Sequence, residues 1–203
     1  MTKTTKAMIL ALTAFMGLAG ASIQANAAEP FMHVGGRTTQ PVGHYEFCRR
    51  LPEECNQKTA RHAPLELTHK LWAAMIEVNN AVNTEVAPRT DLEVYGQEEY
   101  WAYPDKGVGD CEDYALEKRR RLMALGVPAG DLLMTVVRQP NGDGHAVLTV
   151  RTGQGEFILD NLESRVLAWS ETEYTFLKRQ SERNSGVWVQ INNGRADAVA
   201  SVR

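Results

Sequence analysis

The sequence predicts an α+β fold, in which helices come first along the chain and an antiparallel sheet follows. Apolar residues recur at three- and four-residue steps over residues 65–86, which is the period of one helix face. A second helical stretch starts near Cys111, and short β-branched segments separated by turn residues follow it. Helices grouped before strands are typical of α+β domains.

The first 27 residues have the layout of a secretory signal peptide. Two lysines precede an uncharged, mostly apolar run over residues 7–23, and Ala-Asn-Ala at 25–27 is a small-residue cleavage site. A membrane anchor is the alternative, but a span needs about 20 apolar residues, and no basic stop follows this run. We therefore expect cleavage after Ala27 and export to a bacterial periplasm, with secretion beyond it left open. No later stretch is apolar enough to cross a bilayer.

Composition favours one mildly acidic domain. The chain has 203 residues and a formal charge of −3, and cleavage after Ala27 would remove two lysines and make the rest more negative. A nucleic-acid partner needs a basic face, so this class is disfavoured. We expect an irregular segment over residues 28–64, a domain over 65–192 and a frayed C-terminus over 193–203.

Three cysteines in an exported chain leave one thiol over. Cys48 and Cys55 lie close together in the stretch FCRRLPEEC, and an oxidising compartment favours their pairing. Two unpaired cysteines or half a metal site are the alternatives, but the histidines show no ligand spacing. Cys111 is then the free thiol.

The first predicted helix ends before Pro88, and residues 89–109 are loop-like. Trp101 and Tyr103 lie in this loop, just before the free cysteine. They either line a substrate cleft or an oxyanion site, or belong to the core.

The second predicted helix runs from Cys111 to about Leu125, with Asp110 as its N-cap and glycine and proline after its end. Residues 118–121 read Lys-Arg-Arg-Arg, which we interpret as a solvated helix face suited to the C-terminal dipole rather than as an anion site.

Strands are expected at residues 132–138, 145–151, 156–161 and 187–191. A two- or four-residue turn after the second of these pairs Val147 with Asp160, so His145 and Asp160 share a face as diagonal neighbours. A three-residue turn would break this register. The arrangement also requires the helix from Cys111 to pack against that face.

Cys111, His145 and Asp160 are the candidate catalytic residues. A helix N-terminus favours a thiolate, and a thiolate nucleophile needs a base and a group that orients the base. The alternatives are a buried cysteine that acts as a small hydrophobe, a histidine at a turn edge and an aspartate that caps a strand.

The stretches GVGDCEDYALEKRRRLMALGVP, GHAVLTV and FILDNL resemble the bacterial transglutaminase-like cysteine peptidases, which include LapG-type periplasmic proteases. The resemblance covers residues 65–191, with weaker support from PVGHYEFCRRLPEEC upstream. It implies a papain- or transglutaminase-like fold, with the cysteine at a helix N-terminus packed on an antiparallel sheet. By position, Cys111 resembles the nucleophile, His145 the general base and acid, and Asp160 the orienting carboxylate.

Acidic residues surround the candidate nucleophile. Asp110, Glu112 and Asp113 would raise the pKa of the thiol. Either the carboxylates cap the backbone, or a cation such as Ca²⁺ cancels their charge. The resemblance implies calcium dependence with Asp110 and Glu112 as ligands, and Asp113 is a weaker candidate. No organic cofactor is expected.

The resulting expectation is an exported cysteine endopeptidase that works through a thioester. The resemblance implies a protein substrate such as a surface adhesin and restraint by an inner-membrane receptor, although the glycine-rich turn before His145 departs from the family pattern. An acyl transferase with the same triad and a non-catalytic binding module are the alternatives. A sugar deacetylase or metal enzyme is disfavoured because no ligand cluster is evident.

Overall fold

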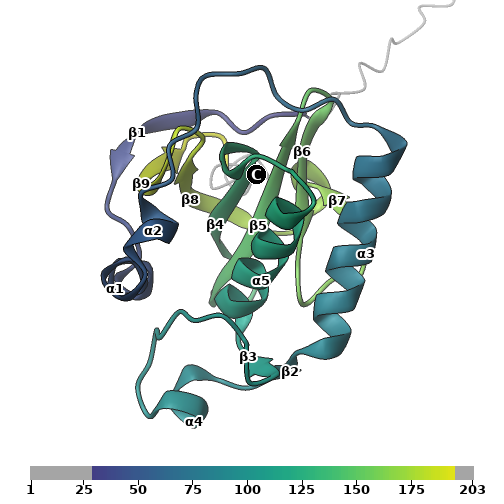
Figure 1. The fold of residues 1–203 in the computed structure, drawn as a ribbon. Helices are drawn as coiled ribbons and strands as arrows, with labels where there is room; N and C mark the ends of the chain where they lie inside the picture. The colour runs from purple at the N-terminus through teal and green to yellow at the C-terminus, as the bar shows by residue number, and fades with distance from the viewer. Residues whose placement is uncertain (1–28, 195–203) are drawn as a thin grey trace, which may run out of the picture.

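A computed structural model of the protein describes residues 29–194. Seven strands form one antiparallel sheet in the order β1-β9-β8-β4-β5-β6-β7 (Figure 1). These strands are β1 (Val34–Thr38), β4 (Leu132–Arg138), β5 (Gly144–Thr152), β6 (Gly155–Leu159), β7 (Leu167–Ala168), β8 (Thr175–Ser181) and β9 (Asn184–Ile191). The predicted α+β class is confirmed, and the four expected strands are present as β4, β5, β6 and β9. The sequence analysis missed β1, β7 and β8.

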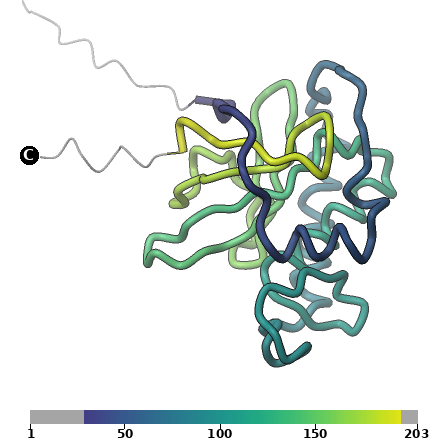
Figure 2. Tube along the Cα trace, turned by 90° about the vertical axis from the view of Figure 1, so that its left-hand side faces the viewer, coloured from purple at the N-terminus to yellow at the C-terminus, as the bar shows by residue number. Residues whose placement is uncertain are grey.

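The helices lie mainly on one side of this sheet. They are α1 (Val42–Arg50), α2 (Pro52–Cys55), α3 (His69–Glu85), α4 (Asp91–Tyr95) and α5 (Cys111–Ala124), with 3-10 turns at Ala129–Asp131 and Trp169–Glu171. In the view turned by 90°, the green and yellow strands lie mainly to the left of the blue and teal helices (Figure 2). Helix α5 packs on β4 and β5, and α3 packs on α5. None of the described helices is both long and apolar enough to span a bilayer.

The two faces of the sheet have separate cores. Leu148 and Val150 of β5 point into the core under α5, together with Leu116 and Leu122. Val147 points the other way, into a smaller core on the opposite face. The smaller core also contains Met32, Val137, Ile158, Trp169, Phe176 and Ile191. The alternation of strand side chains therefore decides which residues α5 covers.

The expectation of an irregular segment over residues 28–64 was wrong. This segment contains β1, which pairs with β9, and the helices α1 and α2. Prolines and glycines hid these elements, because Pro52 starts α2 at its first position and Pro41 precedes α1.

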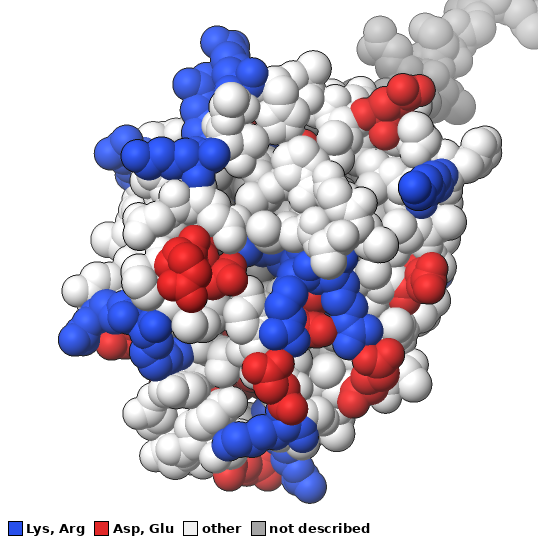
Figure 3. All heavy atoms as spheres, viewed as in Figure 1, with Lys and Arg blue, Asp and Glu red and all other residues white. Residues whose placement is uncertain are grey.

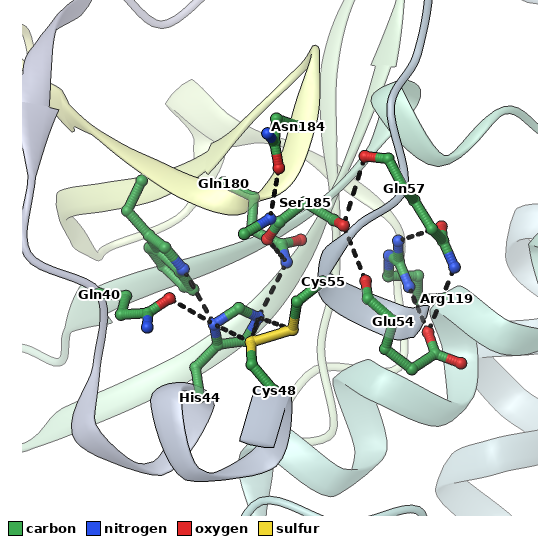
Figure 4. Close-up of a disulfide and its surroundings, with 12 residues drawn as sticks. Gln40, His44, Cys48, Glu54, Cys55, Gln57, Arg119, Gln180, Asn184 and Ser185 are labelled. Atoms are coloured by element: carbon green, nitrogen blue, oxygen red, sulfur yellow. Dashed lines mark hydrogen bonds and ion pairs between the residues drawn. A yellow bond between two sulfur atoms is a disulfide. The ribbon is translucent and has the colours of Figure 1, made fainter. Parts of the chain in front are cut away.

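The predicted disulfide between Cys48 and Cys55 is confirmed. Figure 4 shows it beside His44, whose Nδ1 lies 3.4 Å from the Cys48 sulfur. The imidazole is 1% exposed and also contacts Gln180 and Trp188, with an Nε2–Nε2 distance of 3.1 Å to Gln180. Its burial lowers the pKa of His44 to about 4, so the ring stays neutral. The disulfide thus joins α1 to α2 around a neutral, buried polar contact with the sheet.

Helix α3 confirms the first predicted helix but begins later. Thr68 caps it by accepting a hydrogen bond from Leu71 N at 3.1 Å, whereas Leu65 forms an isolated bridge with Thr152. Helix α5 confirms the second predicted helix. Asp110 occupies its N-cap position as predicted, but its side chain makes no capping hydrogen bond.

The interpretation of residues 118–121 as a solvated face was half wrong. Lys118 is 0% exposed and Arg119 is 2% exposed, while Arg120 and Arg121 reach the surface. Arg119 bonds Glu54 at 3.3 Å, which connects α5 to α2. A four-residue run cannot stay on one helix face at 3.6 residues per turn, so two of its members point inward. On the surface over α5, basic and acidic side chains lie next to each other (Figure 3).

The register expected for the β5–β6 hairpin is confirmed. Arg151 pairs with Glu156 and Thr152 with Gly155, so the turn has two residues. Gly155 has φ 138°, a conformation that L side chains rarely adopt. The signal peptide expected at residues 1–27 lies outside the described residues, as does the expected frayed C-terminus apart from Asn193 and Gly194.

Candidate active site

Cys111 is the first residue of α5, and as a residue it is partly exposed although its thiol is largely enclosed. Its Sγ atom lies 3.1 Å from Glu112 Oε2, and the backbone N–H of Ala146 in β5 interacts with the sulfur. Burial and the adjacent Glu112 carboxylate raise the pKa of the thiol, in opposition to the positive end of the helix dipole. Because its pKa is raised, the thiol of Cys111 stays protonated at neutral pH in this environment.

His145 and Asp160 form a buried hydrogen-bonded pair. His145 Nε2 lies 2.8 Å from Asp160 Oδ1, and the two side chains are 3% and 2% exposed. Burial would raise the pKa of Asp160, but the hydrogen bond from His145 and its charge hold that pKa below its usual value. Since Asp160 occupies Nε2, the imidazole keeps Nδ1 for chemistry.

Tyr174 completes this pair and was missed by the sequence analysis. Its hydroxyl donates to Asp160 Oδ2 at 2.5 Å, and its ring centroid lies 5.5 Å from that of His145. Leu162 N donates to Asp160 Oδ1 at 3.0 Å. Both carboxylate oxygens are thus engaged. The sequence offered no signal for Tyr174, because it precedes the unpredicted strand β8.

The requirement that α5 pack against the face of His145 and Asp160 was wrong. His145 pairs with Val137, which points into the core on the face away from α5. Cys111 reaches β5 at Ala146, beyond the point where β6 ends at Leu159. The thiol therefore lies at the open end of the β5–β6 hairpin, opposite its turn. There the side chain of His145 can approach it from the face of the sheet that α5 does not cover. Among the described residues, the hydrogen bond of the thiol goes to Glu112 and not to His145.

Three carboxylates gather next to Cys111. Oxygen atoms of Asp91, Asp110 and Asp113 all lie within 4.8 Å of one another. A short parallel bridge brings them together, because β2 (Ala87–Pro88) pairs with β3 (Val108–Gly109) just before Asp91 and Asp110 respectively. Asp110 Oδ2 accepts from Asp91 N at 3.2 Å, and Asp113 Oδ1 accepts from Ala102 N at 2.8 Å.

Gly109 makes room for this cluster. A Cβ atom at Gly109 would lie 2.6 Å from Asp113 Oδ2 and 2.7 Å from Asp113 Cβ, closer than real contacts allow. The absence of a side chain at this position therefore lets Asp113 turn back over the start of α5.

The protein offsets the charge of this cluster only in part, because Arg50 acts on Asp91 from beyond ion-pair distance. Asp91 Oδ1, Asp110 Oδ1 and Asp113 Oδ2 are buried with no hydrogen-bond partner, and no ion pair to any of the three exists in the described part of the chain. Burial raises the pKa of Asp113 to about 8, and burial with the adjacent Asp110 raises that of Glu112 to about 9. Ca²⁺ prefers oxygen ligands, and three buried oxygens of this cluster have no protein donor, so the residues present fit a calcium site.

Of the two residues predicted as calcium ligands, the structure places Asp110 inside the carboxylate cluster and Glu112 outside it. Asp110 lies in the cluster with Asp113, the weaker candidate, and with Asp91, which was not predicted. Glu112 is outside this group of three but interacts with the carboxylates of Asp110 and Asp91 while accepting from the thiol. Asp91 is 19 residues before Asp110, and the intervening loop carries no motif that predicts their contact.

The interpretation of Trp101 as a cleft residue was wrong, because Trp101 is 2% exposed and packs in the core against His44 and Trp188. Tyr103 is partly buried against Phe47, and the guanidinium of Arg120 lies 4.3 Å from its ring centroid. Neither side chain contacts the described His145–Asp160 pair.

A helix-borne thiol, a strand-borne histidine and a carboxylate on an antiparallel sheet are the parts expected of a transglutaminase-like cysteine peptidase. The family model of the bacterial transglutaminase-like cysteine proteinases matches residues 34–196, and the chain belongs to that family. The resemblance to the bacterial transglutaminase-like cysteine peptidases is thereby confirmed.

Three solved structures of LapG from Legionella pneumophila are similar in fold. LapG has 24% identity and a TM-score of 0.51, with 79% of this chain and 86% of that chain covered. Calcium-bound LapG has 22% identity and a TM-score of 0.51, covering 78% and 86% of the two chains. EGTA-treated LapG has 23% identity and a TM-score of 0.51, covering 79% and 86%. Comparison with curated proteins finds no match.

Proposed function

We propose that the protein is an exported cysteine endopeptidase in which Cys111, His145 and Asp160 act as a catalytic triad. The observation that carries the proposal is the 2.8 Å hydrogen bond between His145 Nε2 and Asp160 Oδ1, near a free cysteine at a helix N-terminus. Membership of a cysteine proteinase family supports it.

The reaction proceeds in two stages. His145 Nδ1 takes the thiol proton, and the Cys111 sulfur attacks a backbone carbonyl carbon of the substrate. The tetrahedral intermediate collapses as His145 returns the proton to the leaving amine, which breaks the C–N bond and leaves a thioester. His145 then takes a proton from water, the hydroxide attacks the thioester, and the proton returns to the sulfur as the acid product leaves.

Asp160 and Tyr174 have supporting roles in this scheme. The Asp160 carboxylate holds the imidazole in the tautomer that leaves Nδ1 free, and it stabilises the imidazolium that forms. Tyr174 holds the second carboxylate oxygen at 2.5 Å and so keeps Asp160 from rotating.

A calcium ion is the proposed cofactor, with Asp91, Asp110 and Asp113 as ligands and Glu112 nearby. When bound, it supplies positive charge beside the thiol and so favours the thiolate. Their unpartnered buried oxygens support this assignment, as does the calcium-bound form of the similar LapG. Asp110 and Glu112 stay the residues expected from sequence, to which Asp91 and Asp113 are added.

The proposed setting is the periplasm, after removal of residues 1–27. The proposed substrate is a protein such as a surface adhesin, and the proposed regulator is an inner-membrane receptor. Fractionation of a bacterium expressing the full chain tests the first point: the mature protein should appear in the periplasm, and a chain without residues 1–27 should stay in the cytoplasm.

Alkylation of the mature protein tests the chemistry. Two of the three cysteines form the disulfide, so labelling reports Cys111 alone. We expect labelling well below the free-thiol pKa of about 8.5 when calcium is present, and loss of that labelling in His145→Ala.

Cys111→Ala should fold normally, as judged by circular dichroism, and cleave nothing. Hydrolysis that persisted in Cys111→Ala would refute the mechanism, and product masses would separate cleavage from acyl transfer.

A further inference from the structure

A cavity of about 400 Å³ opens beside the His145–Asp160 pair. Asp160 and Tyr174 line it, together with the turn after β4 and the segment between β6 and β8. Neither Cys111 nor His145 lines it, whereas Asp160 and Tyr174, which both contact His145, do. The proposed reaction gives this cavity no role so far.

We propose that this cavity is the subsite for the leaving-group side of a peptide substrate and that it receives a basic side chain. This inference rests on the proposed peptidase function and adds the class of substrate to it.

The direction of the substrate follows from the proton transfer. The amine that leaves must lie against His145 Nδ1 to be protonated, so the chain after the cleaved bond passes on the imidazole side of the thiol. Asp160 holds the opposite nitrogen, Nε2, at 2.8 Å. In the proposed mechanism the thiol, the imidazole and the carboxylate follow one another in this order, so the residues after the cleaved bond continue past the imidazole toward the cavity.

The apolar part of the cavity suits an aliphatic stem. Pro140, Leu162 and Leu167 are among its lining residues. Leu162 is 59% exposed although it follows Asp160 by only two positions. Binding of a substrate over this side chain is favourable, because it removes exposed apolar surface from water.

The charged part of the cavity suits a cation. Glu171 and Glu173 are both exposed at its edge, and neither forms an ion pair in the described residues. Glu171 accepts a hydrogen bond from Ala168 N at 3.2 Å, and its charge also acts on Arg165. The one basic lining residue, Arg165, is neutralised by Glu163 at 2.8 Å. Asp160 has no oxygen to spare. Lysine and arginine combine an apolar stem with a charged head, which matches this lining.

The test is cleavage of a proteome-derived peptide library by the mature protein with calcium, followed by sequencing of the new N-termini. Lysine and arginine should be enriched about fivefold at one of the first three positions after the cleaved bond, the scale of an exposed ion pair. The double variant Glu171→Gln/Glu173→Gln should lose this enrichment. Glu173→Lys should favour acidic residues at the same position. The matched control, Glu53→Gln/Glu66→Gln, changes two exposed glutamates that do not line the cavity and should keep the preference.

A second readout needs no turnover. Alanine-rich peptides that carry one arginine should slow alkylation of Cys111 more than the same peptides with citrulline, and the double variant should abolish the difference. Cleavage without a basic preference, or an arginine effect that survives the double variant, would overturn the subsite and leave the peptidase proposal standing. If no peptide were cleaved but arginine still protected Cys111, the peptidase proposal and with it the leaving-group role would fail, and only binding of a basic side chain in the cavity would stand.

Discussion

The single carboxylate of Asp160 and the group of three carboxylates beside Cys111 differ in how the protein satisfies them. Asp160 receives hydrogen bonds from His145, Leu162 and Tyr174 on its two oxygens, and its pKa is lowered. The cluster of Asp91, Asp110 and Asp113 keeps three buried oxygens without partners, and burial raises the pKa of each. The first carboxylate is complete within the chain. The second group has no ion-pair partner among the described residues, and only the charge of Arg50 acts on Asp91 from further away.

Because of this difference, the state of Asp160 is set by the protein alone, whereas the state of the three-carboxylate cluster depends on whether a cation is bound. A carboxylate held by three donors keeps its charge and position at neutral pH. Clustered carboxylates without a cation repel one another and hold protons, so their state depends on what binds them. We expect the first group to control catalysis and the second to control when catalysis and full stability are available.

The largest expected effect, on the rate of cleavage, comes from removing the charge of Asp160. Asp160→Asn should lower kcat/KM by about 10³- to 10⁴-fold, because the amide no longer selects the tautomer of His145. The rate of peptide cleavage measures this effect, with circular dichroism as a check of folding. Asp143→Asn, an exposed aspartate in the β4–β5 turn, is the matched control and should have normal activity. Equal activity of Asp160→Asn and the control would remove Asp160 from the mechanism.

Calcium binding to the cluster of Asp91, Asp110 and Asp113 should give the next largest effect, on the stability of the protein. Calcium at 100 times its dissociation constant should stabilise the protein by about 2.7 kcal/mol, measured as a rise in Tm relative to a chelator. Asp110→Asn should reduce the rise, because it removes one ligand charge. Asp105→Asn, which changes an exposed partner of Arg120, should keep the calcium response. A calcium-independent Tm in the wild-type protein would contradict the site.

The incomplete group should also make the calcium-free protein sensitive to pH. The pKa of Asp113 is raised to about 8 and that of Glu112 to about 9. Groups with raised pKa values stabilise the folded state fully below their unfolded pKa values near 4, and this stability is lost as pH rises through 8 and 9. In chelator, Tm should therefore fall by several degrees between pH 5 and pH 9. Added calcium should flatten the curve, and Glu112→Gln should reduce its slope. A flat curve in chelator would argue against these protonated carboxyls.

Tyr174→Phe should have a smaller effect on the complete group. Loss of one hydrogen bond to a charged group costs about 1.5 kcal/mol, so we expect kcat to fall roughly tenfold while KM changes little. Without the donor, the pKa of Asp160 rises and the acidic limb of the pH–rate profile moves up. Tyr45→Phe, on the exposed side of α1, is the control. A purely structural role for Tyr174 would lower Tm without moving the pH profile.

The smallest effect is expected at a second His–Asp pair that has no thiol beside it. His62 Nε2 lies 2.6 Å from Asp131, and its bonds to Ala60 and Asp131 raise the pKa of His62. Its stabilisation is present below the unfolded pKa near 6.5 and is lost as pH rises through the folded pKa. His62→Gln should cost at most about 1 kcal/mol at pH 6, measured by urea unfolding, and leave cleavage unchanged. Reduced cleavage would mean that this pair acts on the active site.

The sequence by itself determined the α+β class, the two long helices, the disulfide and the hairpin register. Each depends on local signals: the 3.6-residue period of α3, the turn residues between β5 and β6, and the short separation of Cys48 and Cys55. The register alone was enough to bring His145 and Asp160 to one face.

The tertiary structure decided what surrounds these residues. Asp91 meets Asp110 only because β2 pairs with β3, and Tyr174 meets Asp160 only because the chain after β6 folds back along the sheet. The same is true of the face on which α5 packs and of the burial of Lys118 and Arg119. Such contacts join segments far apart in sequence, so their free energy comes from packing the whole domain, and no local period or motif records them.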